Sequence, residues 1–123
     1  MTASKQSLAS AAMAQTGPIR IGVVTPLTGT YAGIGQQVKW GLDLAARQIN
    51  GGGGIAGRPI ELIYEDEEAN PAVAVQKAEK LFQVSKVDFL TGTVNSGATL
   101  AVGTVIGFWD DGAAGAGATA GAP

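Results

Sequence analysis

The sequence predicts an α/β fold of three layers, in which a parallel sheet with strand order 2-1-3 lies between helices on both faces. Three short apolar runs alternate with three segments of helical periodicity. Such alternation is typical of parallel strands joined by right-handed crossovers. With 123 residues the chain has room for one modest domain and not for a second lobe of equal size.

The first strand is expected over residues 19–24, IRIGVV, a run rich in β-branched side chains. The loop PLTGTYAGIG follows it, and a helix is expected from about residue 36 to residue 50. Asp43 and Arg47 are expected to pair on the solvent side of this helix, and Trp40 is interpreted as a packing residue. The apolar stripe of the helix consists of Val38, Leu42, Ala45 and Ile49.

Residues 51–54 are four consecutive glycines, which end the first helix because glycine accepts the left-handed conformations of a helix end. The second strand is expected over residues 60–65, IELIYE. Asn70 and Pro71 predict the start of a second helix, because asparagine caps well and the first helical position does not need an N–H. This helix is expected to run to about Ser85, with a buried face of Ala74, Ala78, Leu81 and Phe82.

A third strand is expected over residues 87–90, Ser96 is expected to open a third helix, and the domain is assigned to residues 18–107. Residues 1–17 contain a short apolar stretch and an Ala-Met-Ala site, as in the second half of a secretory signal peptide. A flexible cytosolic leader fits them equally well. Residues 108–123 are mostly Ala and Gly, and are predicted to be disordered because they offer little apolar surface to offset ordering entropy. No stretch is long enough to span a membrane.

The composition excludes several classes of function. Without Cys and His, the chain has no disulfide, no Cys/His zinc site, no thiolate nucleophile and no imidazole for acid/base catalysis. Its 8 basic residues are scattered among 10 acidic ones and form no footprint for DNA or RNA. A nucleophile at Ser96 would have no histidine to activate it, so an enzyme is not expected.

Two motifs are assigned structural roles. Residues 29–35, GTYAGIG, lack the Lys-Ser/Thr ending of a phosphate-binding loop and the tight glycine spacing of a dinucleotide site. A flexible loop over a cleft therefore fits them better. The acidic run of residues 65–68 lacks the alternating ligand spacing of a calcium loop, so it is interpreted as a solvated turn rather than a cation site.

Ser96 is the strongest candidate for ligand binding. It follows the third strand at the start of a helix, where its hydroxyl and the N–H groups of Gly97 and Ala98 would converge on a carboxylate. The alternative role for this serine is an ordinary helix cap. The strand order 2-1-3 favours ligand contact, because it places residues 25–35 and 91–96 at one crevice, at the carboxyl ends of their strands.

Three segments, residues 19–50, 51–81 and 87–102, resemble in order and spacing the N-terminal lobe of the Leu/Ile/Val-type solute-binding proteins of bacterial ABC importers. The resemblance implies a type I periplasmic binding fold, in which two α/β lobes joined by a hinge close on an amino acid or similar small molecule in the periplasm. It implies no catalysis and no cofactor. It also implies that the loaded protein docks on an ABC permease in the membrane.

The same resemblance implies which residues bind the ligand. The loop after the third strand would grip the ligand carboxylate through Ser96 and the main chain of Gly97 and Ala98, and Val94 would line an apolar wall. The loop after the first strand would contribute Ile34, where some relatives carry an aromatic residue. The ligand class is therefore open between an amino acid, an amide and an aromatic acid.

The C-terminal residues depart from the family pattern. Relatives continue into a fourth strand and cross to a second lobe, whereas this sequence continues as IGFWDDGAAGAGATAGAP. We therefore expect a truncated or frameshifted fragment that does not bind tightly alone, because a second lobe is needed to desolvate the ligand. The alternative function is the ligand-sensing lobe of a regulator or receptor.

Overall fold

The computed structural model describes residues 17–109, with side chains through Thr104. Its elements in chain order are β1 (Ile19–Thr25), α2 (Ala32–Gly51), β2 (Ile60–Asp66), α3 (Pro71–Gln83), β3 (Phe89–Thr91) and α4 (Ser96–Trp109). The expected leader lies outside the described residues except for Gly17, and so does the expected tail except for Phe108 and Trp109. These two residues belong to α4, which corrects the start of the predicted tail.

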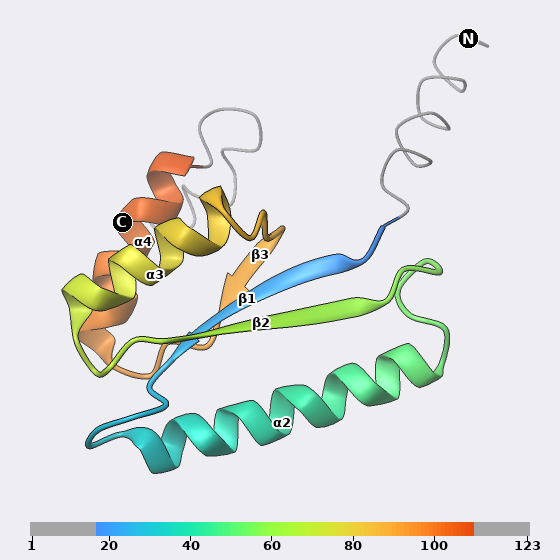
Figure 1. Ribbon diagram of the computed structural model, residues 1–123, viewed down its shortest axis with the longest axis horizontal. Helices are drawn as coiled ribbons and strands as arrows, with labels where there is room; N and C mark the ends of the chain where they lie inside the picture. Colours follow the sequence, from blue (N-terminus) through green and yellow to red (C-terminus); the bar gives the residue numbers. More distant parts are fainter. Residues whose placement is uncertain (1–16, 110–123) are drawn as a thin grey trace, which may run out of the picture.

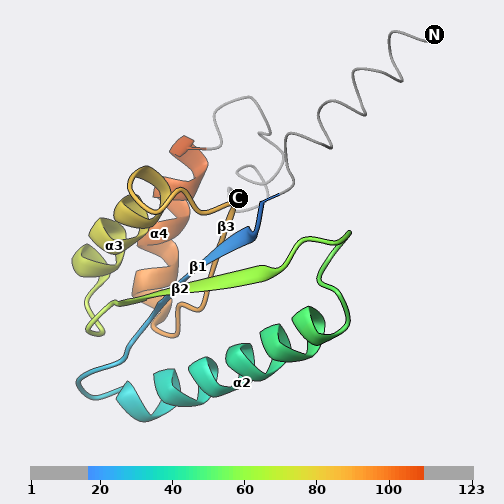
Figure 2. The same cartoon turned by 45° about the vertical axis from the view of Figure 1, so that its right-hand side comes forward.

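The three strands form one parallel sheet with the order β2-β1-β3, as the sequence predicted. In β1, Ile19 lies opposite Ile60 of β2, and Ile21 lies opposite Phe89 of β3. Helix α2 covers one face of the sheet, and helices α3 and α4 lie side by side over the other face (Figures 1 and 2). The fold is therefore the predicted three-layer α/β arrangement. Among the helices of residues 17–109, none combines the length and the apolar character that crossing a bilayer requires.

The hydrophobic core lies between the sheet and the α3/α4 layer. The predicted face of α3 is confirmed, since Ala74, Ala78 and Leu81 are completely buried and Phe82 packs against them. The predicted cap of α3 is also confirmed, because the side chain of Asn70 accepts hydrogen bonds from the N–H groups of the first turn. The other buried members of the core are Val24, Val87, Ala98 and Val102.

Helix α2 begins at Ala32, four residues before the expected start, and Tyr31 at its N-cap position makes no side-chain capping bond. Part of the predicted flexible loop is therefore the first turn of a helix. Gly35 in this turn is buried against Pro26, and a Cβ atom at Gly35 would overlap the carbonyl oxygen of Pro26. This close approach holds the start of α2 against the end of β1.

The face of α2 that lies on the sheet agrees with the predicted one only in part, because Val38 and Leu42 are half-buried whereas Ala45 and Ile49 are exposed. Asp43 points toward β2, where its carboxylate accepts a 2.6 Å hydrogen bond from the Tyr64 hydroxyl and a 2.8 Å bond from Lys39 Nζ. Asp43 thus pairs with Lys39 rather than with Arg47. Trp40 is 64% exposed, so its interpretation as a packing residue is wrong. Gly35 lies on the same side of the helix as Asp43, and Val38 and Lys39, three and four residues further on, are half-buried there.

The starts of β2 and β3 are each held by a polar side chain that bonds to the main chain of a strand. The amide of Asn50 pairs with the main chain of Ile60 through bonds of 2.7 and 2.9 Å, and so takes the place of a neighbouring strand. Asp88 accepts the Arg20 N–H through its carboxylate at 3.0 Å and donates its own N–H to the Arg20 carbonyl at 2.7 Å. β3 begins directly after this pair, at Phe89, two residues later than expected.

Replacing Gly35 with alanine tests the contact between α2 and β1. We expect Gly35→Ala to lower the free energy of unfolding by about 1 to 3 kcal/mol or more, because the backbone of Pro26 cannot yield to the new methyl group. The matched control is Gly33→Ala in the same turn, where a Cβ atom meets nothing within 4 Å. This control should gain about 0.5 to 1 kcal/mol from helix propensity. Urea unfolding of both variants measures the difference, and equal stabilities would contradict the assigned contact.

Candidate functional site

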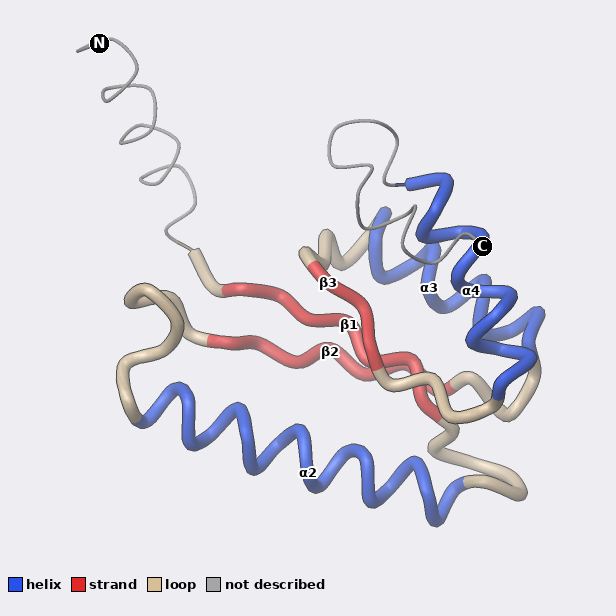
Figure 3. The backbone as a smooth tube through the Cα atoms, turned by 180° about the vertical axis from the view of Figure 1, so that it is seen from behind, coloured by secondary structure: helices blue, strands red, loops and turns tan. Residues whose placement is uncertain are grey.

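Three loops meet at the carboxyl ends of the parallel strands. They comprise residues 26–31 after β1, 67–70 after β2 and 92–95 after β3, and we call this side of the sheet the carboxyl edge. Figure 3 shows that all three loops lie on the same side of the molecule. The helices that follow β1 and β3 leave toward opposite faces of the sheet, as the strand order 2-1-3 led us to expect.

Asp66, the last residue of β2, holds the loop that follows β1. Its carboxylate accepts hydrogen bonds from the Leu27 N–H at 2.8 Å, the Glu68 N–H at 2.9 Å and the Thr28 hydroxyl at 2.6 Å. Burial alone would raise the pKa of Asp66, but these hydrogen bonds outweigh burial and hold the pKa below its ordinary value. The negative charge of Asp66 therefore stabilises the carboxyl edge.

The acidic run of residues 65–68 is not the solvated turn that the sequence predicted. Glu65 lies at 3.3 Å from Lys77 and at 3.0 Å from Lys80, and so joins β2 to α3. Glu67 is completely buried, and Glu68 is exposed as expected. Neighbouring carboxylates separate because successive side chains at a strand end point to opposite faces of the sheet.

Glu67 lies beneath the β3–α4 loop. Burial raises the pKa of its carboxyl, and the nearby charge of Asp66 acts in the same direction. The main-chain N–H groups of Asn95 and Val94 favour the charged form in part. Neither carboxylate oxygen, however, makes a hydrogen bond of acceptable geometry within the described residues.

Asn95, and not Ser96, caps helix α4. Its side-chain oxygen accepts hydrogen bonds from the Gly97 N–H at 2.8 Å and the Ala98 N–H at 3.2 Å. The capping alternative for Ser96 is therefore wrong. The N–H groups of Gly97 and Ala98 are engaged by Asn95, so a carboxylate at this position would have to share them. Ser96 itself is exposed at the first position of the helix.

The other two predicted ligand contacts come from different elements. Ile34 lies in the first turn of α2 rather than in a loop, and its side chain is 48% exposed. Val94 is half-buried in the β3–α4 loop. Gly92 begins that loop with a φ of +101°, and a Cβ atom there would lie 2.6 Å from a methyl group of Val23. Only glycine fits this position, so it contributes to the path of the loop toward Ser96.

Sequence reasoning missed four residues that shape this edge, namely Asp66, Glu67, Gly92 and Asn95. A signal was present for Asn95, because an asparagine directly before a helix is a strong cap, as was recognised for Asn70. No local signal separates Asp66 from Glu67, since both are acidic residues at the end of one strand. Their roles depend on which neighbouring loop each one meets.

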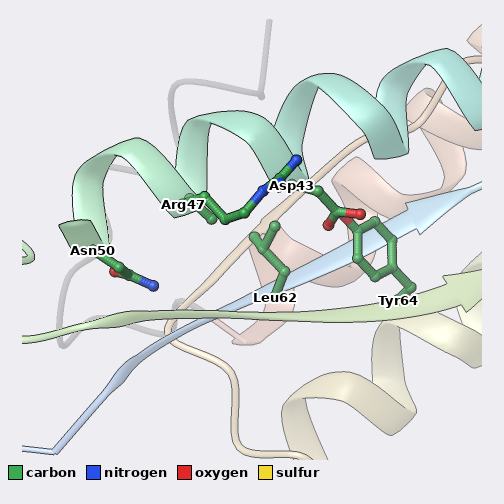
Figure 4. A pocket seen from close by; sticks show the side chains of 6 residues that line it. Asp43, Arg47, Asn50, Leu62 and Tyr64 are labelled. Carbon is green, nitrogen blue, oxygen red and sulfur yellow. The ribbon is translucent and has the colours of Figure 1, made fainter.

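A separate hollow of about 420 Å³ lies between α2 and β2. Figure 4 shows Asp43, Arg47 and Asn50 of α2 above Leu62 and Tyr64 of β2. Several of its polar groups are bonded within the chain, Asp43 to Tyr64 and Asn50 to Ile60. None of the predicted ligand-binding residues lines this hollow, and we assign it to the packing of α2 on the sheet.

The periplasmic binding protein family matches residues 18–107 of the chain. The Leu/Ile/Val-binding protein homolog 2 of Brucella abortus is 39% identical over 82 residues, which are 67% of this chain and 22% of that protein. The chain therefore spans about a quarter of the length of the relatives it matches.

Two solved structures share the fold of this chain. One is a solute-binding protein of an ABC transporter from R. palustris in complex with benzoate, with a TM-score of 0.66, 36% identity and coverage of 72% of this chain and 24% of that one. The other is the branched-chain amino acid transporter substrate-binding protein LivJ from Streptococcus pneumoniae in complex with isoleucine. Its TM-score is 0.68, with 34% identity and coverage of 71% and 25%.

Replacing Asp66 with asparagine tests the link between β2 and the β1–α2 loop. We expect Asp66→Asn to lower the free energy of unfolding by about 1 to 3 kcal/mol at neutral pH, because the variant loses hydrogen bonds to a charged group. Since the folded-state pKa is lowered, this stabilisation is complete above the ordinary Asp pKa of about 3.9. It is lost as the pH falls through the folded-state value.

Urea unfolding at neutral pH and at about pH 2 measures this effect, with the exposed Glu79→Gln on α3 as the control. The Asp66→Asn variant and the unmodified chain should converge in stability in acid. A difference that stays the same at both pH values would show that the charge of Asp66 is not responsible.

Proposed function

Because the chain belongs to the periplasmic binding protein family, which consists of binding proteins and not of enzymes, we propose that residues 18–107 form part of the N-terminal lobe of an ABC importer's solute-binding protein. The ligand is a small carboxylate held between the carboxyl edge and a second lobe. The observation that carries this proposal is Ser96, exposed at the start of a 14-residue helix whose cap is a different residue.

A carboxylate fits this position for three reasons. The N-terminus of α4 carries the positive end of the helix dipole. The Ser96 side chain makes no hydrogen bond within the described residues, so its hydroxyl is free to donate to a ligand. The benzoate and isoleucine of the two solved structures both carry a carboxylate, although they differ in the rest of the molecule.

The remaining contacts set the shape of the ligand. Val94 provides apolar surface beside Ser96, and Ile34 provides it from the start of α2. The N–H groups of Gly97 and Ala98 contribute through bifurcated hydrogen bonds, each donated to both the ligand and the Asn95 side chain. An amino acid, an amide and an aromatic acid all remain within the proposed class.

The cellular role follows from the same assignment. The loaded protein delivers its ligand to an ABC permease from the periplasm. One lobe leaves a bound carboxylate open to water, so we propose that the 123-residue chain alone binds weakly.

A chimera tests this proposal directly. Residues 18–107 replace the matching segment of the Brucella abortus relative, which supplies a second lobe. Calorimetry of the chimera and of the 123-residue chain against amino acids, their amides and aromatic acids should show tight binding of a carboxylate by the chimera only. Micromolar binding by the chain alone would contradict the need for a second lobe. A folded chimera that binds no carboxylate would contradict the proposed ligand class.

Ser96→Ala in this chimera tests the proposed contact. We expect it to weaken ligand binding by about 1.5 to 3 kcal/mol, the range for a hydrogen bond to a charged group. Its thermal stability should change little, because Asn95 retains the cap. The control is Ser85→Ala, because Ser85 lies before β3, at the end of the strand away from Ser96. This variant should bind the ligand with unchanged affinity. Unchanged affinity in Ser96→Ala would remove Ser96 from the site.

A further inference from the structure

Glu67 is the buried ionisable group whose role the fold leaves unexplained. Its side chain has no exposed surface, and both oxygens of its carboxylate lack a hydrogen-bond partner within the described residues. A buried carboxylate without well-formed hydrogen bonds is costly, because nearby N–H groups offset its lost hydration only in part. Its own N–H is bonded to the Thr25 carbonyl at 3.1 Å, so the main chain at Glu67 is held in place.

The main chain of the β3–α4 loop carries the groups that would complement this carboxylate. The N–H groups of Val94 and Asn95 lie close enough to Glu67 to favour its charged form. Within the described residues, neither N–H group donates a hydrogen bond of its own. Two unmatched acceptors therefore face two unmatched donors, and Ser96 is the next residue along the chain.

The position of Glu67 at the end of β2 explains why it faces this loop. Asp66 turns toward the β1–α2 loop and accepts hydrogen bonds from Leu27 and Thr28. Since successive side chains alternate between the two faces of a sheet, Glu67 turns the other way, toward the main chain of Val94 and Asn95. One acid of the pair thus meets the β1–α2 loop, and the other meets the β3–α4 loop.

We propose that Glu67 is a positioning residue for the β3–α4 loop. Its carboxylate accepts hydrogen bonds from the Val94 and Asn95 N–H groups, and this contact holds the loop in the path that presents Ser96. The effect on ligand binding rests on the proposed function. The contact between Glu67 and the loop does not, because it depends only on groups within this lobe.

The charged surroundings of Glu67 are simple enough for its titration to be read. Asp66 is the charged neighbour that affects it, and residues 92–104 contain no ionisable side chain. On α3, Lys77 pairs with Glu65. If the Val94 and Asn95 N–H groups respond to pH, we therefore expect ionisation of Glu67 to be the cause. Ionisation of Asp66 is the alternative that the experiment must distinguish.

The test is a pH titration of the 123-residue chain by NMR, without ligand. The amide resonances of Val94 and Asn95 and the side-chain carboxyl carbon of Glu67 are followed together. We expect all three to share one midpoint above the ordinary Glu value of about 4.3, with the amide protons moving downfield as the carboxylate ionises. Glu67→Gln should abolish the pH-dependent shift of both amide resonances. The control Glu68→Gln, at the exposed neighbouring position, should leave that shift unchanged.

Three outcomes would overturn the proposal. The first is that the two amide resonances do not change with pH. The second is that they follow the lower midpoint of Asp66, and the third is that they change with pH equally in Glu67→Gln. If Glu67→Gln does not fold, the shared midpoint in the unmodified chain still decides the question. Because no ligand is used, failure of the chimera to bind a carboxylate would leave this result intact.

Discussion

The hydrogen bonds that Asp66 accepts from Leu27 and Thr28 are the contact on which the carboxyl edge depends. Parallel pairing brings the ends of β1, β2 and β3 to one side, but pairing alone does not fix the path of the chain beyond each strand. Asp66 fixes the loop after β1 through its side chain, and Glu67 extends the main-chain pairing by one further bond to Thr25. The end of β2 therefore fixes the loop that leads into α2, although Asp66 and Thr28 lie 38 residues apart in the sequence.

A second constraint acts on α2 from the other direction. Gly35 lies against Pro26 so closely that no side chain fits there, which holds the start of the helix against the end of β1. The charged side chains Lys39 and Asp43 are turned toward Tyr64 of β2, and Trp40 is left on the outer surface. This face carries Val38 and Leu42 of the predicted apolar stripe together with charged side chains, whereas Ala45 and Ile49 of the stripe are exposed.

The division of roles between Asn95 and Ser96 has a consequence for binding. An asparagine that satisfies the first N–H groups of α4 leaves the adjacent serine free, so helix stability and ligand contact rest on different side chains. The helix N-terminus is also less open to an anion than the sequence suggested, because Gly97 and Ala98 already have a partner. Selectivity for a carboxylate would then depend on Ser96 and on the exact path of the loop, which is where Gly92 and Glu67 act.

The sequence by itself determined the order of the elements, the parallel sheet, the cap at Asn70 and the buried face of α3, because periodicity and capping are properties of neighbouring residues. It also carried the family resemblance, which the match over residues 18–107 confirmed. Only the tertiary structure decided the rotation of α2, the burial of Glu67 and the choice of Asn95 as the cap of α4. The first two depend on contacts between segments far apart in the chain. The local sequence pattern is the same whichever face of the helix meets the sheet and whichever way the acidic side chain points. The third is a choice between two adjacent residues that both cap well, and the hydrogen bonds from Gly97 and Ala98 show that Asn95 takes the role.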